Sequence, residues 1–133
     1  MIVVLDANFL TVPAQFSIDI FSEAERLLEQ RVEFVVLSSV VREIENKVTA
    51  AHNRTEVRAF KVAQELVSRC RVIEPDEVLQ QYPVDTQLLH YTESVRGVLA
   101  TNDKELRQRA RNQGLPVLLL RGKKRLSVEG VVS

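Results

Sequence analysis

Short apolar runs without polar interruption alternate along this chain with segments of helical periodicity. Such runs are typical of strands that are buried on both faces of a parallel sheet. The expected strands are residues 2–5, 34–37, 71–73, 97–101 and 116–120. The expected helices are 17–31, a segment that begins after Ser38 and Ser39, then 55–68, 85–92 and 104–112, with a loop at 12–16. This pattern predicts an α/β three-layer sandwich, in which a central, mainly parallel sheet of about five strands has helices on both faces.

The composition favours a single folded domain over residues 1–133. Apolar residues make up 45% of the chain and charged residues 27%, which is typical of a globular domain and excludes disorder. The longest apolar runs are far shorter than the roughly 20 residues that cross a bilayer, so we expect no membrane association. The single cysteine, Cys70, excludes an internal disulfide and fits a cytoplasmic location. We interpret Cys70 as a core residue on the apolar face of a helix.

The charges of the chain sum to zero but are unevenly placed. Eight Lys and Arg residues against Glu105 give residues 104–125 a net charge of +7, so the remainder carries −7. A basic final third joined to an acidic body is expected where one surface meets phosphates and another holds cations. Ordinary solvated helix and strand faces would give the same distribution.

Several polar residues stand where the expected strands end. They are Asp6 and Asn8 after the first strand, Ser38 and Ser39 leading to Glu43 after the second, and Thr101, Asn102 and Asp103 after the fourth. Because the carboxyl ends of parallel strands share one edge of the sheet, where ligands bind, we expect these residues to lie close together. A further carboxylate, Asp85, shares the apolar side of its helix with Leu88, and charges seldom point inward without a partner. Asp103 likewise shares a face with Leu106.

Each acidic residue also has a simpler explanation. Asp6 fits a turn, Asp103 or Asn102 an N-cap, Asp85 the negative charge that a helix dipole favours, and Glu43 a solvated helix position. These explanations do not account for several carboxylates that converge at one edge of the sheet. Their mutual repulsion would lower the stability of the fold unless a cation offsets it. Carboxylates without Cys or His suit Mg²⁺ or Mn²⁺ better than zinc. His52 and His90 are far from the strand ends, and we interpret both as surface or core residues.

Four stretches resemble the signature blocks of the PIN-domain nucleases, in the right order and at the right spacing. They are residues 5–10, residues 38–44, Asp85 with Leu88 three residues on, and residues 101–106. The loop at 12–16 and the tail at 120–130 further resemble an archaeal branch of this family. That branch is similar to the eukaryotic small-subunit ribosomal RNA processing endonucleases and is often grouped with VapC-type toxins.

The resemblance implies an endoribonuclease that depends on one or two Mg²⁺ or Mn²⁺ ions. The residues around the ions would be Asp6, Glu43, Asp85 and Asp103, and the supporting polar groups would be Asn8, Thr101 and Asn102. Many relatives have two consecutive acids at the third block, whereas Val84 precedes Asp85 here, so one carboxylate is available there. The implied partners are single-stranded or ribosomal RNA, an antitoxin or a pre-ribosomal particle, and a second copy of the chain in a homodimer.

Phosphodiester hydrolysis needs an activated water opposite the leaving oxygen, and two cations roughly 4 Å apart meet that need. We hypothesise in-line attack that leaves a 5′-phosphate and a 3′-hydroxyl. The carboxylates repel the RNA backbone, so basic side chains must bind it and make the affinity depend on salt. The expected contacts are Lys104, Arg107 and Arg111 on the last helix and Arg121, Lys123, Lys124 and Arg125 after the final strand, with Arg42, Lys47, Arg54 and Arg58 on the other rim. Few aromatic residues are present for base stacking, so weak sequence specificity is expected.

Three alternatives stay open. A non-catalytic RNA-binding or assembly module would keep the fold and use the acids for structure. Within the nuclease class, a toxin restrained by an antitoxin competes with a housekeeping ribosomal RNA processing factor, and the tail at 120–130 favours the second. A phosphatase-like or response-regulator-like receiver is weaker, because no Lys is clearly placed at the strand edge to contact a phosphoryl group.

Overall fold

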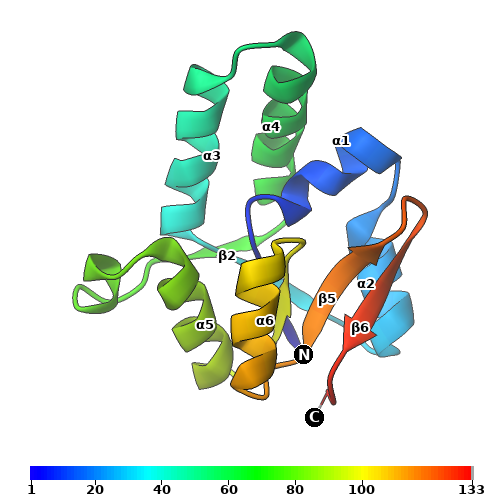
Figure 1. Ribbon diagram of the computed structural model, residues 1–133, viewed down its shortest axis with the longest axis vertical. Helices are drawn as coiled ribbons and strands as arrows, with labels where there is room; N and C mark the ends of the chain where they lie inside the picture. The colour runs from blue at the N-terminus through cyan, green and yellow to red at the C-terminus, as the bar shows by residue number, and fades with distance from the viewer. Residues whose placement is uncertain (133) are drawn as a thin grey trace.

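One sheet forms the centre of the molecule in the computed structural model, which describes residues 1–132 (Figure 1). Within those residues its six strands follow the order β3-β2-β1-β4-β5-β6. They are β1 Ile2–Leu5, β2 Glu33–Leu37, β3 Arg71–Ile73, β4 Val98–Ala100, β5 Val117–Arg121 and β6 Arg125–Glu129. The first five pair in parallel, and β6 pairs antiparallel with β5. The predicted α/β architecture is confirmed, with one strand more than the sequence pattern indicated.

Strand β6 corrects the expectation that a basic tail follows the last strand. The chain turns back after β5, and Arg121 faces Arg125 across the resulting hairpin. Gly122 occupies the turn with a φ of 64°, which costs glycine little because it has no Cβ. Leu126 is buried in the core, whereas Arg125 is exposed and residues 127–129 are half-buried. This edge strand therefore lacks the continuous apolar run that marks the inner strands.

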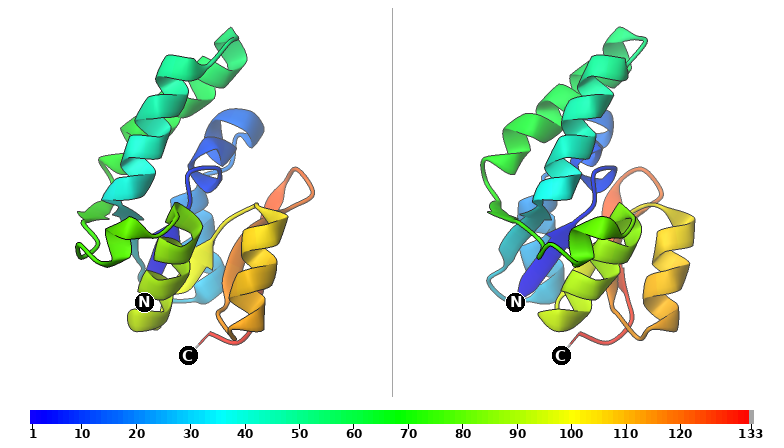
Figure 2. Two further views of the ribbon diagram at one scale, coloured as in Figure 1. Left: turned by 60° about the vertical axis from the view of Figure 1, so that its left-hand side comes forward. Right: turned by 90° about the vertical axis from the view of Figure 1, so that its left-hand side faces the viewer.

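Helices cover both faces of the sheet (Figures 1 and 2). Helices α5 (Val84–Ser94) and α6 (Lys104–Asn112) lie on one face, and α2 (Ile20–Leu28) lies on the other. Helices α3 (Ser38–Ala50) and α4 (Arg54–Val67) form a hairpin that projects beyond the carboxyl ends of the parallel strands. Helix α4 packs on the short elements η1 (Phe9–Thr11) and α1 (Val12–Phe16), and η2 (Leu79–Gln81) precedes α5. The α3–α4 hairpin thus forms a helical arm on one side of the carboxyl ends of the strands.

Side-chain caps fix the beginnings of three helices. Asp19 accepts hydrogen bonds from the N–H groups of Phe21 and Ser22 at the start of α2. Asn53 caps α4 and Asp103 caps α6 in the same way. Each cap satisfies a backbone donor that the helix itself leaves unpaired, which typically stabilises it by about 1 kcal/mol.

Two local expectations were wrong. Residues 12–16, expected as a loop, form helix α1, in which Pro13 occupies the first turn and so interrupts no intrahelical hydrogen bond. Cys70 does not belong to a helical stripe, because α4 ends at Val67 and Cys70 follows in the turn to β3. Its half-buried thiol donates a hydrogen bond to the carbonyl of Leu66 (3.5 Å), and burial raises its pKa to about 11. A thiol in that state is a poor nucleophile at neutral pH.

The core is a continuous cluster of buried side chains from the sheet and the helices that face it. Its large members include Phe9, Leu10, Ile44, Leu88 and Leu106. Phe9 and Leu10 follow the polar segment at the end of β1 and are fully buried in the core. They therefore anchor that segment. A bilayer-spanning helix, which needs a long apolar stretch, is not found among residues 1–132.

Candidate functional site

Four carboxylates from separate parts of the chain line one cavity at the carboxyl edge of the sheet. The cavity has a volume of about 160 Å³. Its lining residues are Asp6, Ala7 and Asn8 after β1, Glu43 and Lys47 on α3, Phe60 on α4, Asp85 on α5 and Asp103 before α6. The structure thus brings together all four acidic residues that the sequence singled out.

Asp6 is the most deeply placed of these carboxylates, with 6% of its surface exposed. Its Oδ2 accepts a hydrogen bond from the Thr101 hydroxyl (2.7 Å), and its Oδ1 accepts one from the N–H of Ala7 (2.8 Å). Burial raises the pKa of Asp6 to about 6, although these two hydrogen bonds lower it, and the charges of Glu43 and Asp85 raise it further. The fold therefore holds this carboxylate in one orientation at a cost in stability.

Glu43 and Asp85 extend the cluster from two helices. Burial raises the pKa of Glu43, the Lys47 ammonium opposes that rise, and the charge of Asp85 adds to it. Burial also raises the pKa of Asp85, with a further contribution from Asp103. The charge of one carboxylate thus raises the pKa of Asp6, of Glu43 and of Asp85, so these groups lie close enough to affect one another's charge state.

Asp103 lies differently from the expectation that it points inward with Leu106. It is exposed, and its Oδ1 caps α6 by accepting a hydrogen bond from the Leu106 N–H (2.9 Å). The N-cap explanation is therefore correct for one oxygen. The side chain still lines the cavity together with the other carboxylates.

The three supporting polar residues hold the strand ends in place. Thr101 is fully buried and, besides donating to Asp6, accepts a hydrogen bond from the N–H of Asp103 (3.1 Å). Asn8 accepts one from the N–H of Asn102 (3.1 Å), which joins the ends of β1 and β4. The Asn102 side chain reaches β5, where it accepts a hydrogen bond from the Leu120 N–H (2.8 Å). Asn102 thus ties the loop to the sheet and is not among the cavity-lining residues.

Phe60 is a cavity-lining residue that the sequence did not indicate. It lies on α4, and the centroid of its ring is 5.5 Å from the Lys47 ammonium. A cation over an aromatic face is favourable by about 0.5–1 kcal/mol at a partly exposed site. Phe60 therefore steadies Lys47 next to Glu43, where it offsets part of the negative charge.

The donor set of the cavity fits a hard divalent cation. Carboxylate and amide oxygens are the ligands that Mg²⁺ and Mn²⁺ prefer. In the part of the chain that the structure describes, no three His, Cys, Asp or Glu side chains are gathered closely enough to hold one ion. Mg²⁺ usually retains several waters and binds through one or two carboxylates, so a fully gathered set is not required.

The basic residues expected to bind RNA divide into two groups. Arg42, Lys104, Lys123, Lys124 and Arg125 are exposed, as is Lys47, although Lys47 also lines the cavity. Two others are half-buried. Arg107 lies 3.7 Å from the Glu129 carboxylate, and Arg111 donates a hydrogen bond to the Leu115 carbonyl (3.0 Å). These two side chains are engaged within the fold, which the sequence pattern of α6 does not reveal.

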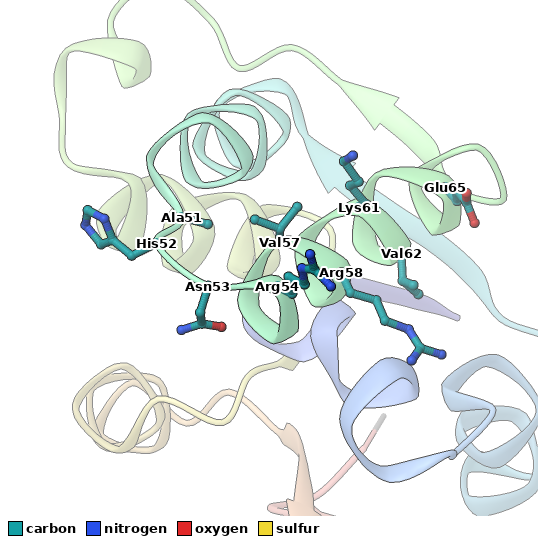
Figure 3. A pocket seen from close by; sticks show the side chains of 9 residues that line it. All are labelled: Ala51, His52, Asn53, Arg54, Val57, Arg58, Lys61, Val62 and Glu65. Carbon is teal, nitrogen blue, oxygen red and sulfur yellow. The ribbon is translucent and has the colours of Figure 1, made fainter.

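A separate groove of about 560 Å³ lies on α4 near its connection to α3 (Figure 3). It contains Arg54, Arg58 and Lys61, and none of its lining residues lines the acidic cavity. In Figure 3 the side chains of Arg58 and Lys61 leave the helix on opposite sides. The positive charges of this groove are therefore spread around the helix and are not gathered toward the carboxylates.

The hydroxyl of Thr101 provides a test of how the site is held. We expect Thr101→Val to lower the free energy of unfolding by about 1–3 kcal/mol, because Asp6 and the Asp103 N–H both lose a buried partner. The pKa of Asp6 should rise further, since the lost hydrogen bond lowers it. Urea denaturation at neutral pH measures the effect. Thr101→Ser, which keeps the hydroxyl, is the control, and equal losses in the two variants would contradict this role.

The parallel sheet, its overhanging helical arm and the carboxylate cluster at the strand ends define a PIN-like protein. The family model described as a PIN like domain matches residues 3–123, and the chain belongs to this family. Ribonuclease VapC4 of Methanocaldococcus jannaschii is 28% identical over 131 residues, which are 98% of each chain.

Two solved structures share the fold. The PIN domain endonuclease Utp24 has a TM-score of 0.77 and 23% identity, over 98% of this chain and 92% of that one. VapBC2 from Rickettsia felis, solved with a DNA fragment from its promoter, has a TM-score of 0.65 and 16% identity, over 91% of this chain and all of that one. The expected PIN fold is thereby confirmed.

Proposed function

We propose that this chain is an endoribonuclease that depends on Mg²⁺ or Mn²⁺. The observation that carries the proposal is the convergence of Asp6, Glu43, Asp85 and Asp103 on one cavity. Carboxylates whose pKa is raised by burial and by neighbouring negative charges destabilise a fold, and such clusters are typical of functional sites. The name of the relative from Methanocaldococcus jannaschii, a ribonuclease, supports RNA as the substrate.

Each of one or two ions would be held by one or two of these carboxylates together with waters, with Asp6 as the fixed ligand and Asp103 contributing the oxygen that does not cap α6. When bound, such an ion lowers the pKa of the attacking water and neutralises charge on the phosphoryl group and the leaving oxygen. Thr101 and the Ala7 N–H orient Asp6 toward that task. Lys47, held over Phe60, would lie beside the cleaved phosphodiester. In-line hydrolysis would leave a 5′-phosphate and a 3′-hydroxyl.

Two biological roles are compatible with this activity. The relative named VapC4 and the structures of VapBC complexes support a toxin-like ribonuclease with an antitoxin partner. The resemblance of the tail to the ribosomal RNA processing branch supports action on a pre-ribosomal particle. A small antitoxin-like reading frame beside the gene would favour the first role, and cleavage at one place in a structured ribosomal RNA would favour the second.

Titration of the protein with metal tests the activity and the site together. The protein is first freed of metal with a chelator and is then incubated with a structured ribosomal RNA fragment and increasing Mg²⁺ or Mn²⁺. We expect cleavage to appear with the ion and the downstream products to carry a 5′-phosphate that a ligase can use. Equal cleavage by the chelated protein would contradict metal dependence. Binding of RNA without cleavage under any of these conditions would favour the non-catalytic module.

A further inference from the structure

A second groove adjoins the acidic cavity along one face of α3. It has a volume of about 500 Å³ and is lined by Ser39, Arg42, Glu43, Asn46 and Lys47, with Val84 opposite at the start of α5. These positions on α3 recur at helical spacing and therefore share one face. Glu43 and Lys47 line both the groove and the acidic cavity, so a ligand in the groove would lie against the carboxylate cluster.

Ser39 is the most unusual residue of this groove. It is 8% exposed, and among residues 1–132 its hydroxyl has no hydrogen-bond partner. A buried polar group without a partner is costly, and native proteins leave few of them. The missing partner would be satisfied by a ligand in the groove that carries hydrogen-bond acceptors.

The position of Ser39 in the helix specifies the charge of that ligand. Ser39 is the second residue of α3, and the first turn of this 13-residue helix has no side-chain cap; α5 also has none, whereas α2, α4 and α6 are capped. Uncapped N–H groups and the positive end of the helix dipole both favour an anion. Arg42, exposed one turn further along the same face, adds a full positive charge and a planar set of donors that suits phosphate.

The remaining lining suits the rest of a nucleotide. Val84 and the aliphatic stems of Arg42 and Lys47 offer apolar surface for a base or sugar. The Asn46 amide provides a donor and an acceptor for a base edge. The volume is within the range of small-ligand sites, about 300–1,000 Å³.

We propose that this groove binds the nucleotide next to the cleaved phosphodiester, with its phosphate held by Ser39, Arg42 and the first turn of α3. The site rests on the proposed ribonuclease function, because it extends that substrate beyond the reacting phosphate. Its ligand class is a nucleoside monophosphate unit of an RNA chain. Glu43 lies at the junction, between the held phosphate and the carboxylate cluster.

Adenosine 5′-monophosphate is the probe, added to the whole protein in the presence of a chelator so that the metal site does not take part. We expect the backbone amide signals of Ser39 and Val40 to shift in NMR spectra. Ser39→Ala and Arg42→Ala should each bind the probe about tenfold more weakly, the loss of roughly one charge-assisted hydrogen bond. Adenosine without the phosphate should bind far more weakly than the monophosphate.

Matched controls separate this site from general effects. Ser38→Ala removes a neighbouring hydroxyl that also lacks a partner in the described chain but does not line the groove. Arg31→Ala removes an exposed charge just before β2, at the other end of that strand. Both controls should bind the monophosphate like the wild type. Ser39→Ala should be at least as stable as the wild type in thermal denaturation, because it removes an unpaired polar group.

Equal affinity of the wild type, Ser39→Ala and Arg42→Ala would overturn the proposal, as would amide shifts confined to residues outside α3. Equal binding of adenosine and its monophosphate would also overturn it. These results are independent of cleavage. Normal cleavage with an unchanged KM in both groove variants would refute the nucleotide site alone, whereas monophosphate binding by a protein that never cleaves RNA would refute the ribonuclease and retain the site.

Discussion

Asp6→Asn should abolish RNA cleavage and make the metal-free protein more stable above pH 6. We expect cleavage to fall by more than about a hundredfold, because even groups that only support metal ligands contribute 10–100-fold. The stability gain follows from the raised pKa of Asp6, about 6 in the folded protein against 3.8 as a model value. Well below pH 4 the carboxyl is protonated in both states. Between about pH 4 and 6 it is ionised in the unfolded chain but still protonated in the folded protein, so the wild type loses stability across this window, by up to about 3 kcal/mol, and the loss is complete above pH 6.

Urea denaturation of the chelated protein between pH 4 and 8 measures this dependence. The wild type should become less stable between about pH 4 and 6 and change little from Asp6 above that, and Asp6→Asn should reduce this slope. Glu77→Gln, at an exposed position outside the cavity, is the control and should behave like the wild type. Added Mg²⁺ at a hundred times its Kd should stabilise the wild type by about 2.7 kcal/mol and leave Asp6→Asn unchanged. An Asp6→Asn protein that cleaves RNA within tenfold of the wild type would refute the assigned role of this residue.

Replacement of Lys123, Lys124 and Arg125 by alanine should have the largest effect on RNA affinity. The three lie at the turn of the β5–β6 hairpin, on the same side of the molecule as the carboxyl ends of the parallel strands (Figure 1). Their exposed charges replace counterions on the phosphate backbone, so loss of three contacts should lower the slope of log affinity against log salt by about 2 for single-stranded RNA. At low salt we expect affinity to fall about a hundredfold.

Fluorescence anisotropy with a labelled single-stranded RNA measures this effect between about 50 and 200 mM salt. The measurement uses Asp6→Asn protein, so that the RNA stays intact. Arg107→Ala is the control, because Arg107 is paired with Glu129 and should change the slope little. Equal slopes for the triple variant and its parent would show that the hairpin does not contact RNA.

The parallel part of the fold could be predicted because burial on both faces leaves a clear sequence signal. Residues 2–5 and 34–37 are continuous apolar runs, and the structure places both as inner strands. Strand β6 gives no such signal, since it is an edge strand in which Arg125 and Glu129 flank the buried Leu126. Helix α1 was not predicted, because its five residues include Pro13 and are too few to show a helical repeat.

The part of the candidate site that lies at the ends of parallel strands could be predicted, because the direction of the strands determines which residues meet there. Asp6 and Thr101 end neighbouring parallel strands, so their meeting follows from topology alone. The approach of Phe60 depends on how the α3–α4 hairpin packs over the strand ends, and a single helical pattern carries no information on that packing. The pairing of Arg107 with Glu129 was hidden for the same reason, since the strand carrying Glu129 was itself not expected.

The double use of Asp103 has a consequence for how such proteins change over time. Its Oδ1 begins α6, and Asn begins helices as well as Asp does. Exchange of one oxygen for an amide nitrogen at this position would therefore leave the architecture whole while removing the negative charge of one of the proposed metal ligands. If the proposed site is correct, a single nucleotide change converts such a nuclease into a folded protein that has lost a ligand and still carries its basic hairpin, which is a short route by which duplicated copies become non-enzymatic subunits.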